Sequence, residues 1–315
     1  MGSLGGGQRR SFQGNPVAPS LHYPNPRGRY RPMISPSIKP QAVENRAIPD
    51  TVPFYDAMAE HYHLIFRDWD ASMAHQGAVL AGLLGSPAAC GPILDCACGI
   101  GTQSLALAKR GYRVDACDLS PAEVARAQKE AISRSVPLRV WTDDMRFLTR
   151  ARSDHYAAIL CLDNALPHLQ GEEDILRALG AMRDRLRPGG RLFISLRDYA
   201  PLIKERSTTT PPQFFDDSGL RRIVFQVWDW LDDRRYTLHL HISRQVGEDG
   251  HSTEWQSHHF VGQYRALLTE EVVTLAQSIG LTEVEVLSPS RTGFYQPIVT
   301  ALRPLSKDDQ SGQTP

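Results

Sequence analysis

A glycine-bearing loop follows an apolar segment in the first third of the chain. Its residues in order are Ile93-Leu94-Asp95-Cys96-Ala97-Cys98-Gly99-Ile100-Gly101-Thr102. Glycines after a strand let the backbone approach a ligand closely, at the carboxyl edge of a parallel sheet where such folds bind cofactors. The segment therefore predicts a cofactor-binding loop. The alternative is a tight strand-to-helix turn that holds no ligand.

A carboxylate, Asp118, ends the next apolar segment, roughly 20 residues after Gly99. A carboxylate at this spacing accepts hydrogen bonds from ribose hydroxyls, so the two features together predict a cofactor that contains adenosine. A dinucleotide fits less well, because the third glycine of G-x-G-x-x-G would fall on Ser104. Asp143 and Asp144 follow the third apolar segment, where a side chain could hold the adenine amino group or could face solvent in a turn.

The segments that would position these residues alternate between short apolar runs and amphipathic helices, as in βαβ units. One helix opens at Ser120-Pro121-Ala122-Glu123, a capping box with proline in the first turn, and another repeats apolar residues from Ile175 to Leu186. We predict an α/β fold with a doubly wound, Rossmann-like, seven-stranded and mostly parallel sheet. Its first five strands are expected at Ile93–Cys96, Arg113–Cys117, Leu138–Trp141, Ala157–Leu162 and Arg191–Leu196.

The pattern changes after the fifth strand. Three runs, Arg222–Leu231, Arg235–Arg244 and Thr253–Val261, are separated by turn residues, which predicts an antiparallel β insertion over about residues 205–265. The chain then returns to one helix and two last strands of the main sheet. These are Glu270–Ser278, Val284–Leu287 and Gln296–Leu302.

Two helices are expected before the glycine-bearing loop. The first is one amphipathic helix from Pro53 to Trp69, and the second has Asp70 as a cap and ends at Gly85. Together, residues 51–85 are expected to cover the cofactor site.

The remaining domain boundaries follow from composition. Residues 1–50 are rich in Pro, Gly, Ser and Arg and are expected to be a disordered tail, as are residues 306–315. Residues 86–305 are expected to form the main domain, including the insertion.

Charge and hydropathy limit the classes of partner. Lys plus Arg and Asp plus Glu both number 35, so no whole-chain field favours nucleic acid or an acidic membrane surface. No apolar run approaches the ~20 residues that a bilayer requires. We therefore expect a small-molecule partner, no nucleic acid and no membrane, in a chain that is compatible with a homo-oligomer.

The cysteines indicate a reducing compartment. They form an odd set and lie in or beside segments predicted to be buried strands or tight loops, which suits free thiols and a cytoplasmic location. Two of them form a Cys-x-Cys pair that could be half of a metal site, but no second Cys/His pair stands at ligand spacing, so we predict no metal. The five are Cys90, Cys96, Cys98, Cys117 and Cys161.

From about Pro53 to Arg303 the sequence resembles the class I S-adenosylmethionine-dependent methyltransferases, and within them the glycine N-methyltransferase family and its bacterial relatives. The resemblance implies S-adenosylmethionine as the cofactor and a small-molecule methyl acceptor. It is carried by four short stretches, Asp95–Thr102, Asp118, Cys161–Leu169 and Leu196–Tyr199.

The resemblance also implies which residues form the site. Arg197 matches the arginine that holds the substrate carboxylate, with Asn164 and Tyr199 beside it as substrate-binding residues. The residues expected to bind the cofactor are Tyr55, Tyr62, Asp95, Ala97, Gly99, Gly101, Thr102, Asp118, Leu119, Asp144, Met145, Leu162 and His168.

Other readings of several of these residues stay open. Tyr55 and Tyr62 could pack in the core, His168 could cap the following helix, and Arg197 could pair with a neighbouring aspartate, Asp198 or Asp163. The sequence also departs from the family. Asp163 stands where the enzyme that acts on glycine has glycine, and the tyrosines that line its acceptor site are replaced near Phe214-Phe215 and around Phe260.

Three functions follow from these observations. The first is N-methylation of a small amine or amino acid held by Arg197, such as a glycine-like acceptor. The second is O-methylation of a small carboxylic or phenolic metabolite, which requires a general base. The third is a cofactor-binding module without catalysis. The candidate bases for the second are His168 and the insertion histidines His239, His241, His258 and His259.

Overall fold

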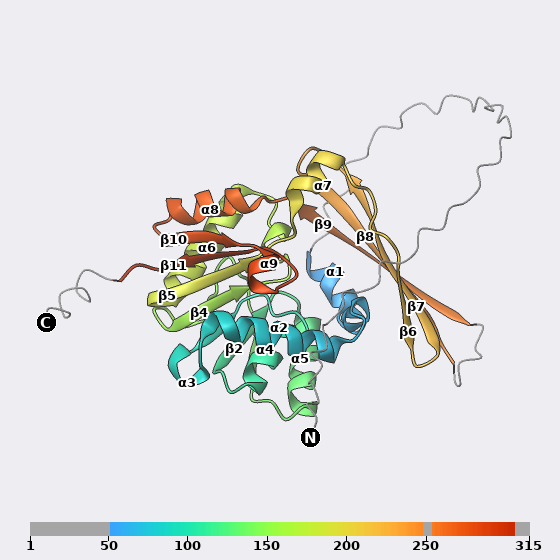
Figure 1. The fold of residues 1–315 in the computed structure, drawn as a ribbon, viewed down its shortest axis with the longest axis horizontal. Coiled ribbons are helices and arrows are strands. Elements are labelled where there is room, and N and C mark those ends of the chain that lie inside the picture. Colours follow the sequence, from blue (N-terminus) through green and yellow to red (C-terminus); the bar gives the residue numbers. More distant parts are fainter. Residues whose placement is uncertain (1–50, 248–253, 306–315) are drawn as a thin grey trace, which may run out of the picture. The chain divides into compact units, whose positions relative to one another are not determined.

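The computed structural model describes residues 51–247 and 254–305 of the chain (Figure 1). The tails expected at 1–50 and 306–315 lie outside the described residues, as do most of the predicted turn at 247–250 and the first residue of the strand predicted from Thr253.

A seven-stranded sheet with the order β10-β11-β5-β4-β1-β2-β3 forms the centre of the described chain. Its neighbouring strands are parallel, except that β11 is antiparallel to both β5 and β10. The predicted α/β fold with a mostly parallel sheet is confirmed. The strands are β1 Ile93–Asp95, β2 Val114–Asp118, β3 Arg139–Thr142, β4 Tyr156–Cys161, β5 Leu186–Ser195, β10 Thr282–Leu287 and β11 Ile298–Leu302.

Helices cover both faces of this sheet, because its central strands are apolar on both sides. Ile93 of β1 packs in one buried cluster with α2 and α4, and its neighbour Leu94 packs in another cluster with α6 and α8. Figure 1 shows these two pairs of helices on opposite sides of the sheet. The helices are α2 Trp69–Leu84, α4 Thr102–Lys109, α5 Pro121–Ser133, α6 Glu172–Arg185 and α8 Thr269–Ser278; short helices lie at α3 Pro87–Cys90, α7 Tyr199–Glu205 and α9 Pro289–Thr292.

The strand order reverses at β1. Its two neighbours are β2 on one side and β4 on the other, so the connections after β1 and β4 lead away from each other at the carboxyl edge of the sheet. Open α/β sheets bind ligands in the crevice that forms at such a point. The loops after β1, β2, β3 and β4 are therefore the ones that matter for function.

A separate antiparallel sheet of four strands forms the insertion, one strand more than the sequence predicts. The missed strand is β6, in which only Phe215 is buried, so its sequence carries no alternation of apolar and polar residues. A turn at Ser218-Gly219, with φ angles of 59° and 92°, joins it to the next strand. The four strands are β6 Gln213–Asp217, β7 Leu220–Trp230, β8 Arg235–Gln245 and β9 Trp255–Arg265.

The N-terminal region does not form the single helix predicted from Pro53 to Trp69. It divides into α1 (Thr51–Met58) and a 3-10 turn, η1 (Tyr62–Ile65), before α2 begins. The guanidinium of Arg222 accounts for the interruption between η1 and α2, because it donates to the carbonyl oxygens of Leu64 and Phe66 and removes them from any helical ladder.

The N-cap of α2 is Asp68 and not Asp70. The Asp68 side chain accepts a hydrogen bond from the backbone N–H of Ala71 at 2.9 Å. The first predicted helix, from Pro53 to Trp69, runs past this capping residue, so the predicted start of the next helix lies too far along the chain.

Helix α1 contacts the insertion sheet. Its Phe54 ring lies against Gly262 of β9, where a Cβ would approach the ring to 3.2 Å. Phe54 also belongs to the same buried cluster as Trp228 and Tyr264 of the insertion. Figure 1 shows α1 beside β9.

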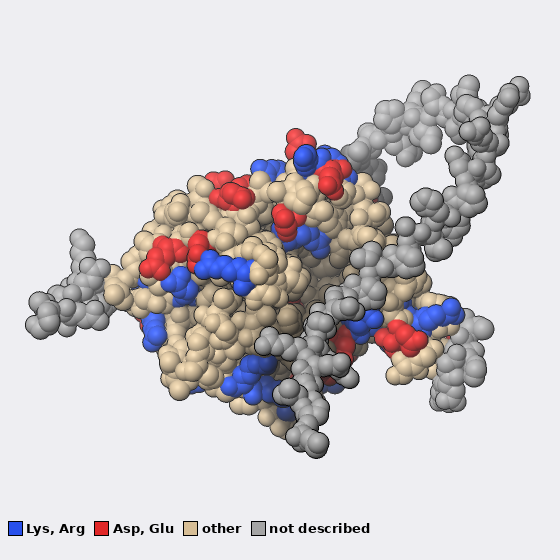
Figure 2. Space-filling model, in the orientation of Figure 1, with Lys and Arg blue, Asp and Glu red and all other residues tan. Residues whose placement is uncertain are grey.

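Charged side chains of both signs are interspersed on the face drawn in Figure 2, without a continuous patch of either sign. Within residues 51–247 and 254–305, no helix combines the length and the apolar character that a membrane span requires.

Candidate functional site

Two glycines in left-handed conformations shape the loop after β1. The φ angle is 53° at Gly99 and 96° at Gly101, values that residues with a side chain rarely adopt. Gly101 is the N-cap of α4, and Gly99 donates its N–H to Asp118 Oδ2 at 2.9 Å. A Cβ on Gly99 would lie 3.4 Å from Glu123 Oε2. This is an ordinary contact distance, so the left-handed φ of Gly99, more than its distance from α5, favours glycine at this position.

Asp118 ends β2 and is held in one orientation by the backbone. Its Oδ2 accepts from Gly99 N–H and its Oδ1 from Ser120 N–H, both at 2.9 Å. Burial raises the pKa of Asp118, and the backbone hydrogen bonds from Ser120 and Gly99 oppose that rise. Each oxygen keeps a further lone pair, so this carboxylate can accept two hydrogen bonds from a ligand's hydroxyl groups.

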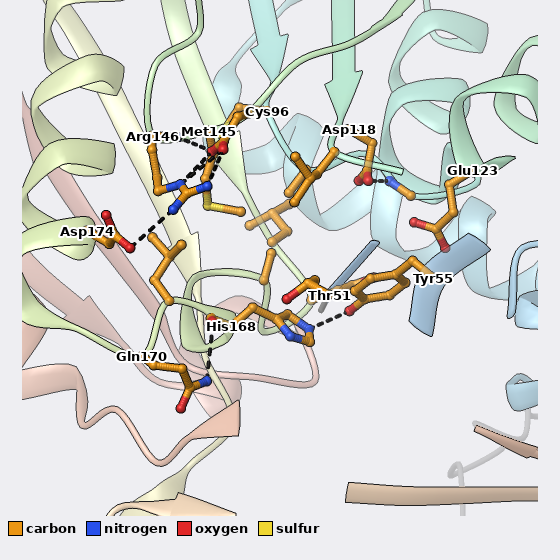
Figure 3. A pocket seen from close by; sticks show the side chains of 18 of the residues that line it. Thr51, Tyr55, Cys96, Asp118, Glu123, Met145, Arg146, His168, Gln170 and Asp174 are labelled. Atoms are coloured by element: carbon orange, nitrogen blue, oxygen red, sulfur yellow. Dashed lines mark hydrogen bonds and ion pairs between the residues drawn. The ribbon is translucent and has the colours of Figure 1, made fainter. Parts of the chain in front are cut away.

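A cavity of about 280 Å³ opens beside these residues (Figure 3). Asp95, Gly101 and Thr102, which were expected to bind the cofactor, do not lie on its wall. The expected residues that do line it are Tyr55, Tyr62, Ala97, Gly99, Asp118, Leu119, Asp144, Met145, Leu162 and His168.

Asp95 and Thr102 lie behind the cavity wall and hold the loop after β1 in place. Asp95 Oδ2 accepts from Ser104 Oγ at 2.5 Å, and burial raises the pKa of Asp95 to about 7. Thr102 Oγ1 accepts from Trp69 Nε1 at 3.0 Å, which joins α4 to α2. Their contacts hold the loop in the shape that the wall requires.

The two aspartates after β3 have different environments. Asp143 organises its own loop, with Oδ2 accepting from Trp141 Nε1 at 3.2 Å and from Arg150 N–H at 2.9 Å. Burial works to raise the pKa of Asp143, but these hydrogen bonds outweigh it and the pKa lies below its usual range. Asp144 lines the cavity, where Arg146 binds it at 2.6 Å. Of the two, only Asp144 is placed to meet a ligand.

His168 lies across the cavity from the glycine loop. Its Nε2 is 2.7 Å from the hydroxyl of Tyr55 in α1 (Figure 3). Its ring also packs against Tyr264 of β9, with centroids 4.0 Å apart. Burial lowers the pKa of His168 to about 3. The imidazole is therefore neutral at physiological pH and ties α1 and the insertion to the cavity wall.

Glu123 is a cavity residue that sequence reasoning missed. The sequence assigns it to a capping box, but the box is only half formed: Ser120 Oγ accepts from Glu123 N–H at 3.1 Å, while Ser120 N–H bonds Asp118 instead of Glu123. The Glu123 carboxyl is 1% exposed, and within the described residues its Oε1 has no hydrogen-bond partner. Figure 3 shows it directed at the cavity near Tyr55. A capping box that leaves its glutamate unpaired cannot be recognised from the sequence.

In the ligand-free protein, the free energy of unfolding of Glu123→Gln relative to that of the wild type is expected to be higher at pH 8 than at pH 5. Burial, together with Asp118 and Asp56, raises the pKa of Glu123 well above its ordinary value of 4.5. The folded state then binds more protons than the unfolded state above that value, so this carboxyl lowers stability as pH rises toward its raised pKa. The variant should gain on the order of 1 kcal/mol or more relative to the wild type between the two pH values.

Urea unfolding of both proteins at both pH values measures this gain. The exposed Glu205→Gln at the end of α7 is the control and should show no such difference. A pH-independent difference between wild type and Glu123→Gln would contradict the expected proton uptake.

A second, larger cavity of about 630 Å³ lies against the insertion. Arg197, which follows β5, lines it, and both Nη atoms are 3.3 Å from Gln226 Oε1 of β7. The guanidinium also lies over the Trp228 ring, 4.6 Å from its centroid. Asp198 and Asp163, the partners considered from the sequence, do not pair with it, and no carboxylate among the described residues lies within ion-pair distance of Arg197. Gln226 and Trp228 were not identified from the sequence, because nothing in an alternating β-strand marks them as cavity residues.

A strained turn after β4 supports the second cavity. Asp163 and Asn164 have φ angles of 55° and 65°, and their N–H groups donate to Ser195 Oγ and Ser195 O at the end of β5. Asn164 lines the cavity, and its amide makes two bonds to the protein, with Oδ1 accepting from Arg197 N–H and Nδ2 donating to Tyr199 OH at 2.8 Å. Tyr199 is buried behind the wall. These two predicted substrate residues therefore position Arg197 and the turn.

The two cavities meet. Tyr55, Tyr62 and Asp163 line both of them. Among the described residues, no cluster of His, Cys, Asp and Glu has the arrangement that a metal ion requires. None of the insertion histidines proposed as bases lines either cavity; these are His239, His241, His258 and His259.

Comparison with known proteins gives a family match and several relatives. The family described as Methyltransferase domain matches residues 93–190. A glycine/sarcosine N-methyltransferase of Parasynechococcus marenigrum (strain WH8102) is 34% identical over 137 residues, which are 44% of this chain and 48% of that protein. The chain thus spans about half the length of that relative. Glycine N-methyltransferase of Rattus norvegicus is 32% identical over 222 residues, which are 66% of this chain and 75% of that protein.

A solved structure has the same fold. It is that of S-adenosylmethionine-bound CalS10, an amino pentose methyltransferase from Micromonospora echinaspora. The TM-score is 0.60 at 20% identity, and the match covers 74% of this chain and 92% of that chain.

Proposed function

The chain belongs to the class I S-adenosylmethionine-dependent methyltransferases, in the family that includes glycine N-methyltransferase, and on that premise we propose that it methylates the nitrogen of a small, carboxylate-bearing amine. The cofactor of this class is S-adenosylmethionine. We place it in the smaller cavity and the acceptor in the larger one, so that the two would meet at Tyr55, Tyr62 and Asp163.

The residues of the smaller cavity fit this cofactor. Asp118 has lone pairs free for ribose hydroxyls, Gly99 leaves space that a Cβ would occupy, and Glu123 Oε1 is a buried oxygen without a partner in the described chain. When bound, S-adenosylmethionine supplies a methyl group that is already activated by the positive charge on sulfur. The chain is left to orient the acceptor and to exclude water, which needs no nucleophilic triad.

The observation that carries the proposed acceptor is the state of Arg197. Within residues 51–247 and 254–305, this partly buried guanidinium has a neutral amide and an aromatic ring as side-chain partners and no anion. A planar guanidinium binds a carboxylate through two parallel hydrogen bonds, which would fix the acceptor relative to the methyl group. This supports an acceptor with a carboxylate, such as an amino acid.

Transfer to a phenolic oxygen is less well supported, because it requires a general base. His168, with a pKa lowered by burial to about 3 and its Nε2 bound to Tyr55, is a poor base for a hydroxyl at neutral pH. His75 lines the larger cavity, but its Nε2 is 3.1 Å from the carbonyl oxygen of Gly293. A nitrogen acceptor in its neutral form attacks without such a base.

The decisive experiment is a panel of acceptors with radiolabelled S-adenosylmethionine, followed by identification of the labelled atom. We expect label on the nitrogen of carboxylate-bearing amines. Label on oxygen would favour the O-methyltransferase, and cofactor binding without transfer to any acceptor would favour the non-catalytic module.

The purified protein is expected to bind S-adenosylhomocysteine at least roughly 100-fold more tightly than NAD, a difference of about 2.7 kcal/mol. Asp118 offers the ribose contact, while Ser104 stands where a dinucleotide loop has its third glycine. Isothermal titration calorimetry with both ligands tests this. Binding of NAD with no heat from S-adenosylhomocysteine would overturn the assignment of the smaller cavity.

A further inference from the structure

Asp163 occupies the boundary between the two cavities. It is the first residue after Leu162, which follows β4, and its left-handed backbone turns its carboxylate toward the place where the cavities meet. A methyl group that passes from a donor in one cavity to an acceptor in the other must cross this boundary. Asp163 therefore lies next to the reacting atoms.

The partners that hold this carboxylate are neutral. Oδ2 accepts from Gln103 Nε2 at 2.7 Å and Oδ1 accepts from Tyr295 OH at 2.5 Å. Gln103 also donates to Gln76 Oε1 at 2.7 Å, so the carboxylate is anchored through α4 to α2. No cation among the described residues lies within ion-pair distance of it. Burial raises the pKa of Asp163, which those two hydrogen bonds oppose.

Arg197 and Asp163 thus present one unpaired cation and one unpaired anion to the same cavity. Each is fixed by neutral hydrogen bonds and neither is neutralised by the other. A buried charge without a counter-charge is costly, and a ligand that carries the two complementary charges relieves both costs at once.

We propose that Asp163, which stands where the enzyme that acts on glycine has glycine, binds the amino group of the acceptor whose carboxylate Arg197 holds. This inference rests on the proposed function and deepens it by assigning a residue to the reacting nitrogen. The larger cavity, walled by Trp228, Leu238 and Leu240 of the insertion, leaves room for an apolar side chain on that acceptor.

The chemistry of the transfer is consistent with this placement. The ammonium of the free amino acid first loses one proton to solvent, which leaves a neutral amine. Its lone pair forms the new bond to carbon, the carbon–sulfur bond breaks with its electrons on sulfur, and the positive charge moves from sulfur to nitrogen. The extra proton on the methylated nitrogen then leaves to solvent. A carboxylate that accepts a hydrogen bond from the amine orients its lone pair and stabilises the charge that develops there.

A rival role for Asp163 is to balance the positive sulfur of the cofactor. The two roles differ in a measurable ratio. S-adenosylmethionine is cationic at sulfur and S-adenosylhomocysteine is not, so removing a carboxylate that serves the sulfur would weaken the first ligand selectively. Removing one that serves the acceptor nitrogen would leave the ratio of the two affinities unchanged.

The test measures binding of matched ligands to protein saturated with S-adenosylhomocysteine, by calorimetry. The pairs are glycine and acetate, alanine and propionate, leucine and 4-methylpentanoate, and phenylalanine and 3-phenylpropionate. The wild type should prefer the amino acid by 10-fold or more in the pair that binds best, because the acid leaves Asp163 unpaired. In Asp163→Asn the preference should fall below about twofold, with an unchanged ratio of affinities for S-adenosylmethionine and S-adenosylhomocysteine.

Two variants separate the failure of this inference from the failure of the proposed function. Asn adopts left-handed conformations as Asp does, so Asp163→Asn should keep the turn, and the exposed Asp198→Asn beside Arg197 is the charge-matched control. Arg197→Gln should weaken both members of every pair. If Arg197→Gln does so but Asp163→Asn keeps the preference for the amino acid, this inference is wrong and the proposed function stands. If no pair binds the wild type, or if Arg197→Gln weakens neither member, the proposed function fails and the inference fails with it.

Discussion

Replacing Arg197 with lysine is expected to lower kcat/KM for a carboxylate-bearing amine by roughly 100-fold or more, with affinity for S-adenosylhomocysteine close to that of the wild type. An ammonium is a point charge and cannot reproduce the planar fork of a guanidinium on a carboxylate. In the protein both Nη atoms already converge on one oxygen, Gln226 Oε1, at the long distance of 3.3 Å. A carboxylate would therefore offer Arg197 shorter and stronger hydrogen bonds than its present partner does.

Steady-state kinetics with a matched pair of acceptors checks this result. Phenylalanine and phenethylamine, or glycine and methylamine, differ only in the carboxylate. For the acceptor without the carboxylate, kcat/KM should be nearly the same in Arg197→Lys and in the wild type. Arg206→Lys is the matched control, because Arg206 also lies over a tryptophan ring, 4.7 Å from the centroid of Trp230, but does not line either cavity. Equal losses for both acceptors would assign Arg197 a purely structural role.

Gly99→Val and Asp118→Ala are each expected to weaken cofactor binding by at least about 10-fold while the fold persists. In Gly99→Val the side chain would enter the cavity, with its Cβ 3.4 Å from Glu123 Oε2, and would hold a φ of 53° that costs about 1–2 kcal/mol for a residue with a Cβ. Asp118→Ala removes a charge-assisted acceptor for ribose hydroxyls, which contributes about 1.5–3 kcal/mol. It also leaves the N–H groups of Gly99 and Ser120 without their present partner.

Calorimetry with S-adenosylhomocysteine and circular dichroism together measure affinity and fold. Gly82→Val in α2 is the control for the glycine, because a Cβ there would meet nothing within 4 Å and no left-handed φ is involved. Asp233→Ala is the control for the carboxylate, because the Asp233 side chain is 97% exposed and lines neither cavity. Wild-type affinity in either site variant would mean that the cofactor binds elsewhere.

Much of the fold can be predicted from the sequence, because the signals involved are local. Apolar strands followed by glycine or aspartate at β1 and β2 mark the carboxyl edge of a parallel sheet, and helical periodicity marks α6. The errors arise where long-range contacts override local preference. The interruption between η1 and α2 involves Arg222, which lies far away in the sequence but donates to the carbonyl oxygens of Leu64 and Phe66.

In the candidate site, too, residues marked by local sequence patterns could be predicted and residues placed by long-range contacts could not. The glycine loop and Asp118 could be found because their spacing along the chain reflects a local turn and one crossover helix. Gln226 and Tyr295 could not, since they reach Arg197 and Asp163 only through the packing of distant segments. From the sequence, Asp163 is a departure from the family pattern and a possible partner of Arg197. That its partners among the described residues are neutral becomes apparent only from the structure.

In its described part, the four-stranded insertion lines one of the two cavities and not the other. Its inner face contributes Trp228, Leu238, Leu240 and Tyr264 to the larger cavity, and within the described residues it contributes nothing to the wall of the smaller one. Its buried side chains pack together with those of α1, η1 and α7, and Tyr264 also lies against His168 on the wall of the smaller cavity. Substitutions of insertion residues other than Tyr264, such as Trp228, Leu238 and Leu240, can therefore alter which molecule fits the larger cavity with little effect on the smaller one, because sites without shared partners act additively. On the proposed placement of the two ligands, a library restricted to residues 213–263 would change the range of acceptors while cofactor binding is kept.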